Sequence, residues 1–269
     1  MLSHGLRGQH RKPVFVFAAD GAMAPIRTEE KKMANCWKEV KGIRGHLLDK
    51  KHIVHLFSWH QISDKAAFAR YPQHIKEQGL IPLDKVRFCF IGDGAGWIWD
   101  TAQSIFPGCR QVLDYFHRAQ HLHDFAQIHF GQNVQASEWM EQVRARLFHN
   151  NVTGVLIGLN NLKCRTPEAQ QARTQLIGYL KNDKARVDYG KLRRGGYPLG
   201  SGAIESANKF ICHIRLKRSG AWWKIDNANN VLKLRCAQYN SKFDDVFEKY
   251  EAVNRKQSRH CAVSLKRIK

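Results

Sequence analysis

The sequence predicts an α/β fold in which a mixed sheet is flanked by helices. Three observations lead to this prediction. Short apolar runs rich in strand-forming residues occur early in the chain, beginning with Val14–Ala19. Two later strands are each followed by a helix, which forces them to pair in parallel. A long stretch with helical spacing, from about 136 to 191, then precedes the last predicted helices.

The first half of the chain contains the strands. Three that can form a meander are expected at 14–19, 37–48 and 52–60. A helix is expected between Asp64, which can cap it, and Gly79, which can end it. Two strand–helix pairs follow, at 86–91 with 95–106 and at 110–113 with 114–130. Mixed sheets with this order occur in the ribonuclease H-like fold.

The second half is helical, with a loop at 193–202 that is indicated by its glycine and proline content. Helices are expected at 201–218 and 224–239, and the basic end of the chain, 255–269, has only a weak pattern and is expected to be a loosely held tail. The predicted division is a first core part at 13–130, a helical insertion at 131–195, the last core helices at 196–240 and a basic C-terminal tail at 241–269.

Charge points to the class of partner. The chain of 269 residues has a formal net charge of +21, which favours a polyanion, with nucleic acid as the first choice and an anionic membrane surface as the second. No run approaches the roughly 20 apolar residues that span a bilayer. The basic N-terminus lacks the apolar stretch of a secretory signal. The seven cysteines are dispersed and form no CxxC pair, which favours reduced thiols in a cytosol.

Aspartates follow three of the predicted strands. Asp20, Asp93 and Asp114 come at or near the carboxyl ends of apolar strands, where α/β sheets bind ligands. Carboxylates at this edge can hold divalent cations, and Mg²⁺ prefers one or two carboxylates together with water and phosphate oxygens. The alternative for Asp20 is an Asp-Gly turn, and for Asp93 a turn or a helix N-cap.

The glycines at 92, 94 and 96 also resemble a dinucleotide-binding turn, which would bind NAD or a flavin. Two residues oppose this interpretation. Trp97 stands where the motif needs a small residue, and Asp93 places a negative charge where a pyrophosphate would lie. The spacing of His117 and His121 permits a zinc pair, but the sequence places no third ligand of the metalloprotease kind.

Three segments together resemble a known family. "VFAADGA", "FIGDGAGWIWDTAQSIFPGCRQVLDYFHRAQHL" and "YPLGSGAIESANKFI" are similar to the DDE transposases of the ISKra group of bacterial insertion sequences, within the wider Mutator-like set. The resemblance covers roughly 13 to 240. It implies a ribonuclease H-like core with a helical insertion before the last acidic residue. It also implies that Asp20, Asp93 and Glu205 are the catalytic acids that hold Mg²⁺, with Mn²⁺ as a substitute.

The segment from Asp114 to His117 matches a further motif of that family. These two side chains share a helix face, so they can order each other or contact metal-bound water or the scissile phosphate. The alternative is a capping aspartate with a packed histidine.

The implied activity is metal-dependent DNA strand cleavage and strand transfer at insertion-sequence ends. The implied partner is double-stranded DNA, on which a homo-oligomer assembles in the bacterial cytoplasm, at the nucleoid and not at a membrane. The chain begins only about a dozen residues before its first strand, whereas family members usually carry a longer N-terminal DNA-binding region. A truncated, non-catalytic DNA-binding remnant is therefore the alternative function.

DNA phosphates are expected to meet lysine and arginine side chains near the third acid. The candidates are Arg193, Arg194, Lys209, Arg215, Lys217, Arg218 and Lys224. The adjacent Trp222 and Trp223 can stack on unpaired bases, although core packing is expected for at least one of them. The alternative for the charged residues is a solvated basic helix face.

Overall fold

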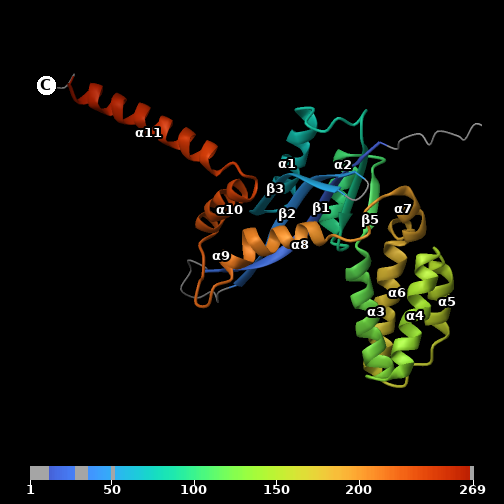
Figure 1. Ribbon diagram of the computed structural model, residues 1–269. Helices are drawn as coiled ribbons and strands as arrows, with labels where there is room; N and C mark the ends of the chain where they lie inside the picture. The colour runs from blue at the N-terminus through green and yellow to red at the C-terminus, as the bar shows by residue number, and fades with distance from the viewer. Residues whose placement is uncertain (1–11, 28–35, 50–51, 267–269) are drawn as a thin grey trace, which may run out of the picture. The chain divides into compact units, whose positions relative to one another are not determined.

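The computed structural model describes residues 12–27, 36–49 and 52–266 (Figure 1). They form a five-stranded mixed sheet with the strand order β3-β2-β1-β4-β5, flanked by helices. The strands are β1 (Val14–Ile26), β2 (Cys36–Asp49), β3 (His52–Ile62), β4 (Arg87–Gly92) and β5 (Arg110–Leu113). The predicted α/β class and mixed sheet are therefore confirmed.

The parallel part of the sheet is built from apolar strands. β1 pairs with β4 and β4 with β5, both in parallel. All six residues of Val14–Ala19 are buried, as expected for a strand covered on both faces. The aromatic rings of Phe17, Phe88 and Phe106 pack against one another in this layer.

Strand β1 is longer than the sequence predicts. The expected strand ended at Ala19, but the extended backbone continues through Asp20 and Gly21 to Ile26. The Asp-Gly pair therefore forms no turn. The residues beyond it, Ala22 and Ala24, are buried, so apolar packing continues past this polar pair.

Seven α-helices precede residue 196 in the described part of the chain. They are α1 (Lys65–Glu77), α2 (Gly96–Ile105), α3 (Tyr115–Phe130), α4 (Val134–Phe148), α5 (Val152–Asn161), α6 (Pro167–Asn182) and α7 (Tyr189–Gly195). Asp64 caps α1 as predicted, by accepting a hydrogen bond from the amide of Ala67. Helices α3 to α6 run side by side (Figure 1), and α4 to α6 lie within the stretch from about 136 to 191 for which helical spacing was expected.

Two helices expected near the end of the chain are present, and a further helix was not expected. The expected helix at 201–218 is present as α8 (Gly202–Asn208), a π-helical turn (Lys209–His213) and α9 (Ile214–Leu216), and α10 (Ile225–Tyr239) also matches. The predicted basic tail contains a helix, α11 (Phe243–Lys266), that the sequence analysis did not expect. Its first part carries apolar residues at helical spacing, which the basic composition conceals.

The chain divides into two compact units, which are described separately below. Unit 1 comprises Met1–Asp20, Arg44–His55 and Asp64–Ile204. Unit 2 comprises Gly21–Ile43, Leu56–Ser63 and Glu205–Lys269. Across the described ranges, none of the helices combines the length and the apolar character that crossing a membrane requires.

Candidate functional site

Three aspartates of unit 1 occupy equivalent positions on adjacent strands. Ala19 pairs with Gly92, and Gly92 pairs with Leu113, in parallel register. Asp20, Asp93 and Asp114 each come one residue after these paired positions. Since neighbouring strands lie about 4.8 Å apart, the structure brings the three residues to one level at the carboxyl edge of β4 and β5.

Asp93 lies where the chain turns from β4 into α2. Its Oδ1 accepts a hydrogen bond from the amide of Ala95 at 3.0 Å, and the side chain remains partly exposed. The next residue, Gly94, has a φ of +112°. A Cβ there would lie 3.2 Å from the Leu113 side chain. Glycine thus permits the tight turn that leaves the Asp93 carboxylate accessible.

Asp114 has a different environment, because it is completely buried. Its Oδ1 accepts hydrogen bonds from the amides of Phe116 at 2.6 Å and His117 at 2.8 Å, which caps α3. Its Oδ2 accepts a further hydrogen bond from the amide of Ser201. These contacts are those of a capping residue that also holds the loop before α8.

The same loop has a second hydrogen bond to α3. The amide of Tyr115 donates to the carbonyl of Leu199 at 2.8 Å. The chain therefore enters the helical insertion and leaves it at one place, next to the capping carboxylate.

His117 is exposed rather than packed, and its Nε2 lies 3.3 Å from the Nε2 of His121. The pKa of His121 is lowered, mainly by burial and to a smaller extent by the charge of nearby His117. The carboxylates of Asp124 and Asp93 partly offset this by raising the pKa. The His121 ring packs on Tyr179, with 4.4 Å between ring centroids. Because its pKa is lowered, His121 is a neutral hydrogen-bonding group at neutral pH.

Tyr179 is a site residue that the sequence analysis missed. Burial is the main cause of its raised pKa, and the nearby carboxylates of Asp183 and Asp93 act in the same direction, so the phenol stays protonated. Its ring also lies 3.4 Å from where a Cβ on Gly94 would be. It comes from α6, far along the sequence, and no local motif marks it.

The acidic edge can bind a hard cation even though it offers few carboxylate ligands. Among the residues that the structure describes, no group of three or more His, Cys, Asp or Glu side chains is arranged to hold a metal ion. Mg²⁺ needs only one or two carboxylates, because water and phosphate oxygens complete its coordination. The pair Asp20 and Asp93 fits that requirement by residue type and by register.

In unit 2, Glu205 lies in the first turn of α8. Its side chain is exposed, whereas Ala207 and Ile211, further along the same helical segment, are buried. Gly202 begins the helix directly after the loop.

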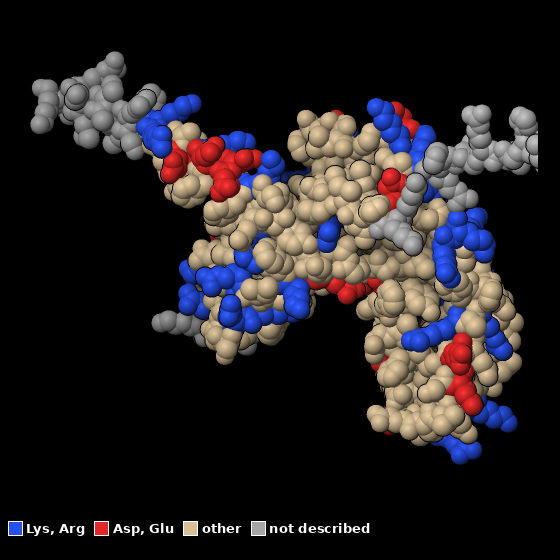
Figure 2. Space-filling model, in the orientation of Figure 1, with Lys and Arg blue, Asp and Glu red and all other residues tan. Residues whose placement is uncertain are grey.

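Exposed basic side chains surround the end of this helical segment. They are Lys209, Arg215, Lys217, Arg218 and Lys224. In Figure 2, lysine and arginine side chains gather over the part of unit 2 that carries α9 and the start of α10. The predicted basic face is therefore exposed to solvent.

The two neighbouring tryptophans differ in their surroundings. Trp223 donates through Nε1 to the carbonyl of Leu216 at 3.1 Å, and Arg215 lies over its ring. Trp222 is 40% exposed and packs edge-on against Trp37, which is 53% exposed, with 6.2 Å between ring centroids. Trp37 was not predicted, because β2 lies far from these residues in sequence.

The remaining predicted basic residues, Arg193 and Arg194, belong to unit 1. They lie in the last turn of α7, so the expectation that they lie in a loop is wrong. The helix continues to Gly195 and ends at Gly196, which has a φ of +71°. Both side chains are exposed, and Arg193 lies over the ring of Phe148.

No protein-family profile matches the chain, and no curated protein sequence matches it at a significant level.

Proposed function

We propose that the chain is the core of a DDE-type transposase with a ribonuclease H-like fold, which cleaves DNA and transfers a strand at insertion-sequence ends. The observation that supports this most is the common level of Asp20 and Asp93 on paired parallel strands. The strand order of the mixed sheet and the resemblance of three sequence segments agree with it.

In this proposal Asp20 and Asp93 hold Mg²⁺ or Mn²⁺, and Glu205 is the third acid on the strength of the segment that contains it. A metal bound there would activate a water or a 3′-hydroxyl of the DNA and would stabilise the leaving oxygen. Asp114 acts as a positioning residue, since its carboxylate binds backbone amides on both α3 and the loop before α8. Neutral His121 offers a hydrogen bond to a phosphate oxygen or a water.

DNA binding is assigned to the basic residues and exposed tryptophans of unit 2, with Arg193 and Arg194 of unit 1 as further phosphate contacts. Phosphate contacts position the duplex and are sequence-independent. Assembly of several copies on DNA at the bacterial nucleoid belongs to the same proposal.

The test is cleavage of a duplex that carries the inverted repeats flanking the gene. Asp93→Asn is expected to lower Mg²⁺-dependent cleavage by at least about 100-fold, because a metal ligand is removed while the side-chain shape is kept. DNA affinity is expected to stay within about twofold, since phosphate contacts supply most of it. Asp84→Asn is the matched control, because Asp84 is an exposed aspartate of the same unit.

Wild-type cleavage by Asp93→Asn would reject the catalytic assignment. The second candidate is a DNA-binding remnant that no longer cuts, which the net charge of +21 and the exposed basic residues of unit 2 favour. Tight, salt-sensitive binding by a wild-type chain that cleaves no repeat-bearing duplex with either metal would support that candidate instead.

A further inference from the structure

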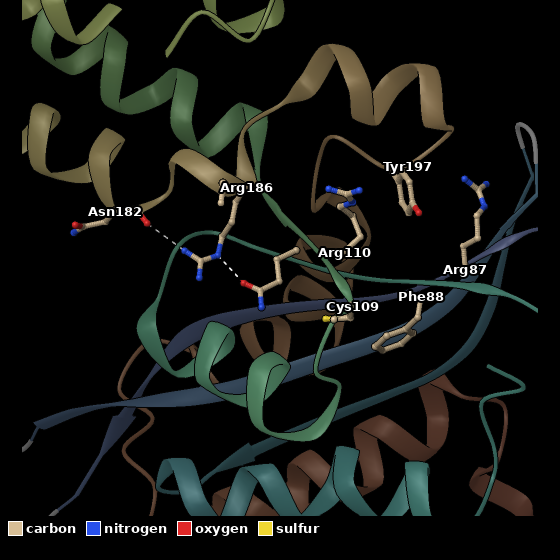
Figure 3. A pocket seen from close by; sticks show the side chains of 10 residues that line it. Arg87, Phe88, Cys109, Arg110, Asn182, Arg186 and Tyr197 are labelled. Carbon is tan, nitrogen blue, oxygen red and sulfur yellow. Dashed lines mark hydrogen bonds between the residues drawn. The ribbon is translucent and has the colours of Figure 1, made fainter. Parts of the chain in front are cut away.

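A pocket of unit 1 lies at the amino-terminal ends of β4 and β5, with a volume of about 650 Å³ (Figure 3). Arg87 is the first residue of β4 and Arg110 is the first residue of β5. Asp93 and Asp114 follow the opposite ends of these strands. β4 has six residues and β5 has four, each rising about 3.3 Å, so Arg87 lies roughly 20 Å along its strand from Asp93 and Arg110 roughly 13 Å from Asp114. Arg87 and Arg110 therefore lie away from the acidic edge, whereas Arg186 approaches it through Asp183, whose carboxylate lies 3.9 Å from where a Cβ on Gly94 would be.

The lining of this pocket is strongly basic. Arg87, Arg110 and Arg186 line it from three different segments, and Figure 3 shows Tyr197 between Arg110 and Arg87, with Arg186 beyond Arg110. Arg186 pairs with Asp183 at 2.8 Å. No carboxylate of the described residues forms an ion pair with Arg87 or Arg110. The pocket thus holds two positive charges that no ion pair within the described chain neutralises.

Neutral contacts hold these arginines in place. Arg87 donates to the carbonyls of Lys12 at 2.9 Å and Gly195 at 2.5 Å. The Tyr197 ring lies between two guanidinium groups, 4.9 Å from Arg87 and 5.8 Å from Arg110. These contacts fix the positions of the Arg87 and Arg110 side chains, and they leave both positive charges available to a ligand.

Arg186 is oriented in a similar way. Its Nε donates to the side chain of Gln111 at 2.7 Å, and its guanidinium lies 4.5 Å from the centroid of the Trp99 ring. Planar, oriented guanidinium groups match the oxygen atoms of phosphates. A volume of this size admits more than one phosphate group, as it lies within the range of about 300–1,000 Å³ typical of ligand pockets.

We propose that this pocket binds a phosphate-bearing ligand, and that the DNA backbone is its main source of phosphate. The assignment to DNA rests on the proposed function, whereas phosphate recognition does not. DNA held by Arg87 and Arg110 lies away from the reacting bond, so these arginines would position the duplex rather than take part in cleavage.

Arginine-specific modification by phenylglyoxal, read at each residue by mass spectrometry, tests the proposal directly. The probes are sodium tripolyphosphate and a 20-base-pair duplex of arbitrary sequence. Arg110 is exposed, and its modification is expected to slow by at least about fivefold when a probe neutralises it. Arg70, an exposed arginine on α1 of the same unit, is the control and is expected to change by less than about twofold.

The two probes distinguish the sources of phosphate. Protection of Arg110 by the duplex supports the DNA backbone, with or without protection by tripolyphosphate. Protection by tripolyphosphate alone supports phosphate recognition and overturns the assignment to DNA. Equal rates at Arg110 with and without both probes, or equal protection at Arg70, overturn the proposal.

A pair of charge reversals gives a second measurement. Arg110→Glu and Arg70→Glu change the net charge equally, and circular dichroism checks that both are folded. Arg110→Glu is expected to weaken duplex binding at least about tenfold and to lower the log–log salt slope by about 0.9 for each phosphate that the variant no longer neutralises. Protection and this mutant effect in a chain without cleavage would refute the catalytic proposal alone. Cleavage without either effect would refute only the pocket.

Discussion

The buried carboxylate of Asp114 accepts a hydrogen bond from the backbone amide of Ser201, 87 residues further along the chain. The same carboxylate caps α3 through two other amides. One side chain therefore fixes both a helix start and the loop before α8.

Replacement of Asp114 by alanine is expected to destabilise the fold by about 2–4 kcal/mol, because it removes a cap and leaves buried amides without an acceptor. Urea unfolding measures this loss. Asp64→Ala is the control, since Asp64 caps α1 at an exposed position, and it is expected to cost about 1 kcal/mol. Equal losses in both variants would show that the contact with Ser201 contributes nothing.

Gly94 and Gly96 offer a test within a single turn. Gly94→Ala forces an alanine into a φ of +112° with Leu113 close by, and we expect a loss of about 1–3 kcal/mol. Gly96→Ala meets no atom within 4 Å and begins a helix, so a gain of up to about 1 kcal/mol is expected. Thermal unfolding of both variants measures these changes in stability. A Gly94→Ala variant as stable as the wild type would contradict the claim that this turn requires glycine.

Trp37 and Trp222 are expected to bind single-stranded DNA together. Each alanine variant should lower affinity for an oligothymidine by about 1–3 kcal/mol if a base stacks on the pair. Because the rings touch, the double variant should lose less than the sum of the two losses. Fluorescence anisotropy of a labelled oligonucleotide measures this, with Trp139→Ala in α4 of unit 1 as control. Additive losses would indicate two independent contacts.

His60 makes unit 2 sensitive to acid. It is buried, its Nε2 lies 2.8 Å from the Asn208 Oδ1, and burial lowers its pKa to about 4. Because the folded pKa lies below the unfolded value of about 6.5, protonation favours unfolding. Stability from this group is complete above pH 6.5 and falls towards pH 4, by about 2 kcal/mol at pH 5.

Urea unfolding between pH 7 and 4.5 measures this dependence. His60→Gln is expected to be less stable at pH 7 but to show a shallower fall with acid. His52→Gln, which removes an exposed histidine, should keep the wild-type slope. An unchanged slope in His60→Gln would assign the acid sensitivity to other groups, such as His46, whose pKa burial also lowers to about 4.

Local patterns predicted most elements of the fold. Apolar runs located all five strands, and the capping aspartates Asp64 and Asp114 marked the starts of α1 and α3. The parallel register could be inferred only in outline, yet it was enough to expect Asp20 and Asp93 at one edge of the sheet.

The remaining features depend on contacts between distant segments. The extension of β1 past Gly21 contradicts a local Asp-Gly turn preference, which tertiary packing overrides. Tyr179 and Trp37 join their partners from elements far away in sequence. The pocket at Arg87 and Arg110 arises from the first residues of two strands, which carry no motif.

Two hydrogen bonds, Tyr115–Leu199 and Asp114–Ser201, join the start of α3 to the loop before α8. The helices between these residues therefore leave the sheet and return to it at the same place. Such a helical segment can be lengthened, shortened or grafted from another protein without changing the spacing of the strand-end aspartates. Variation in this part of the chain would then change the surroundings of the acidic edge, including His121 and Tyr179, while the aspartates themselves keep their register.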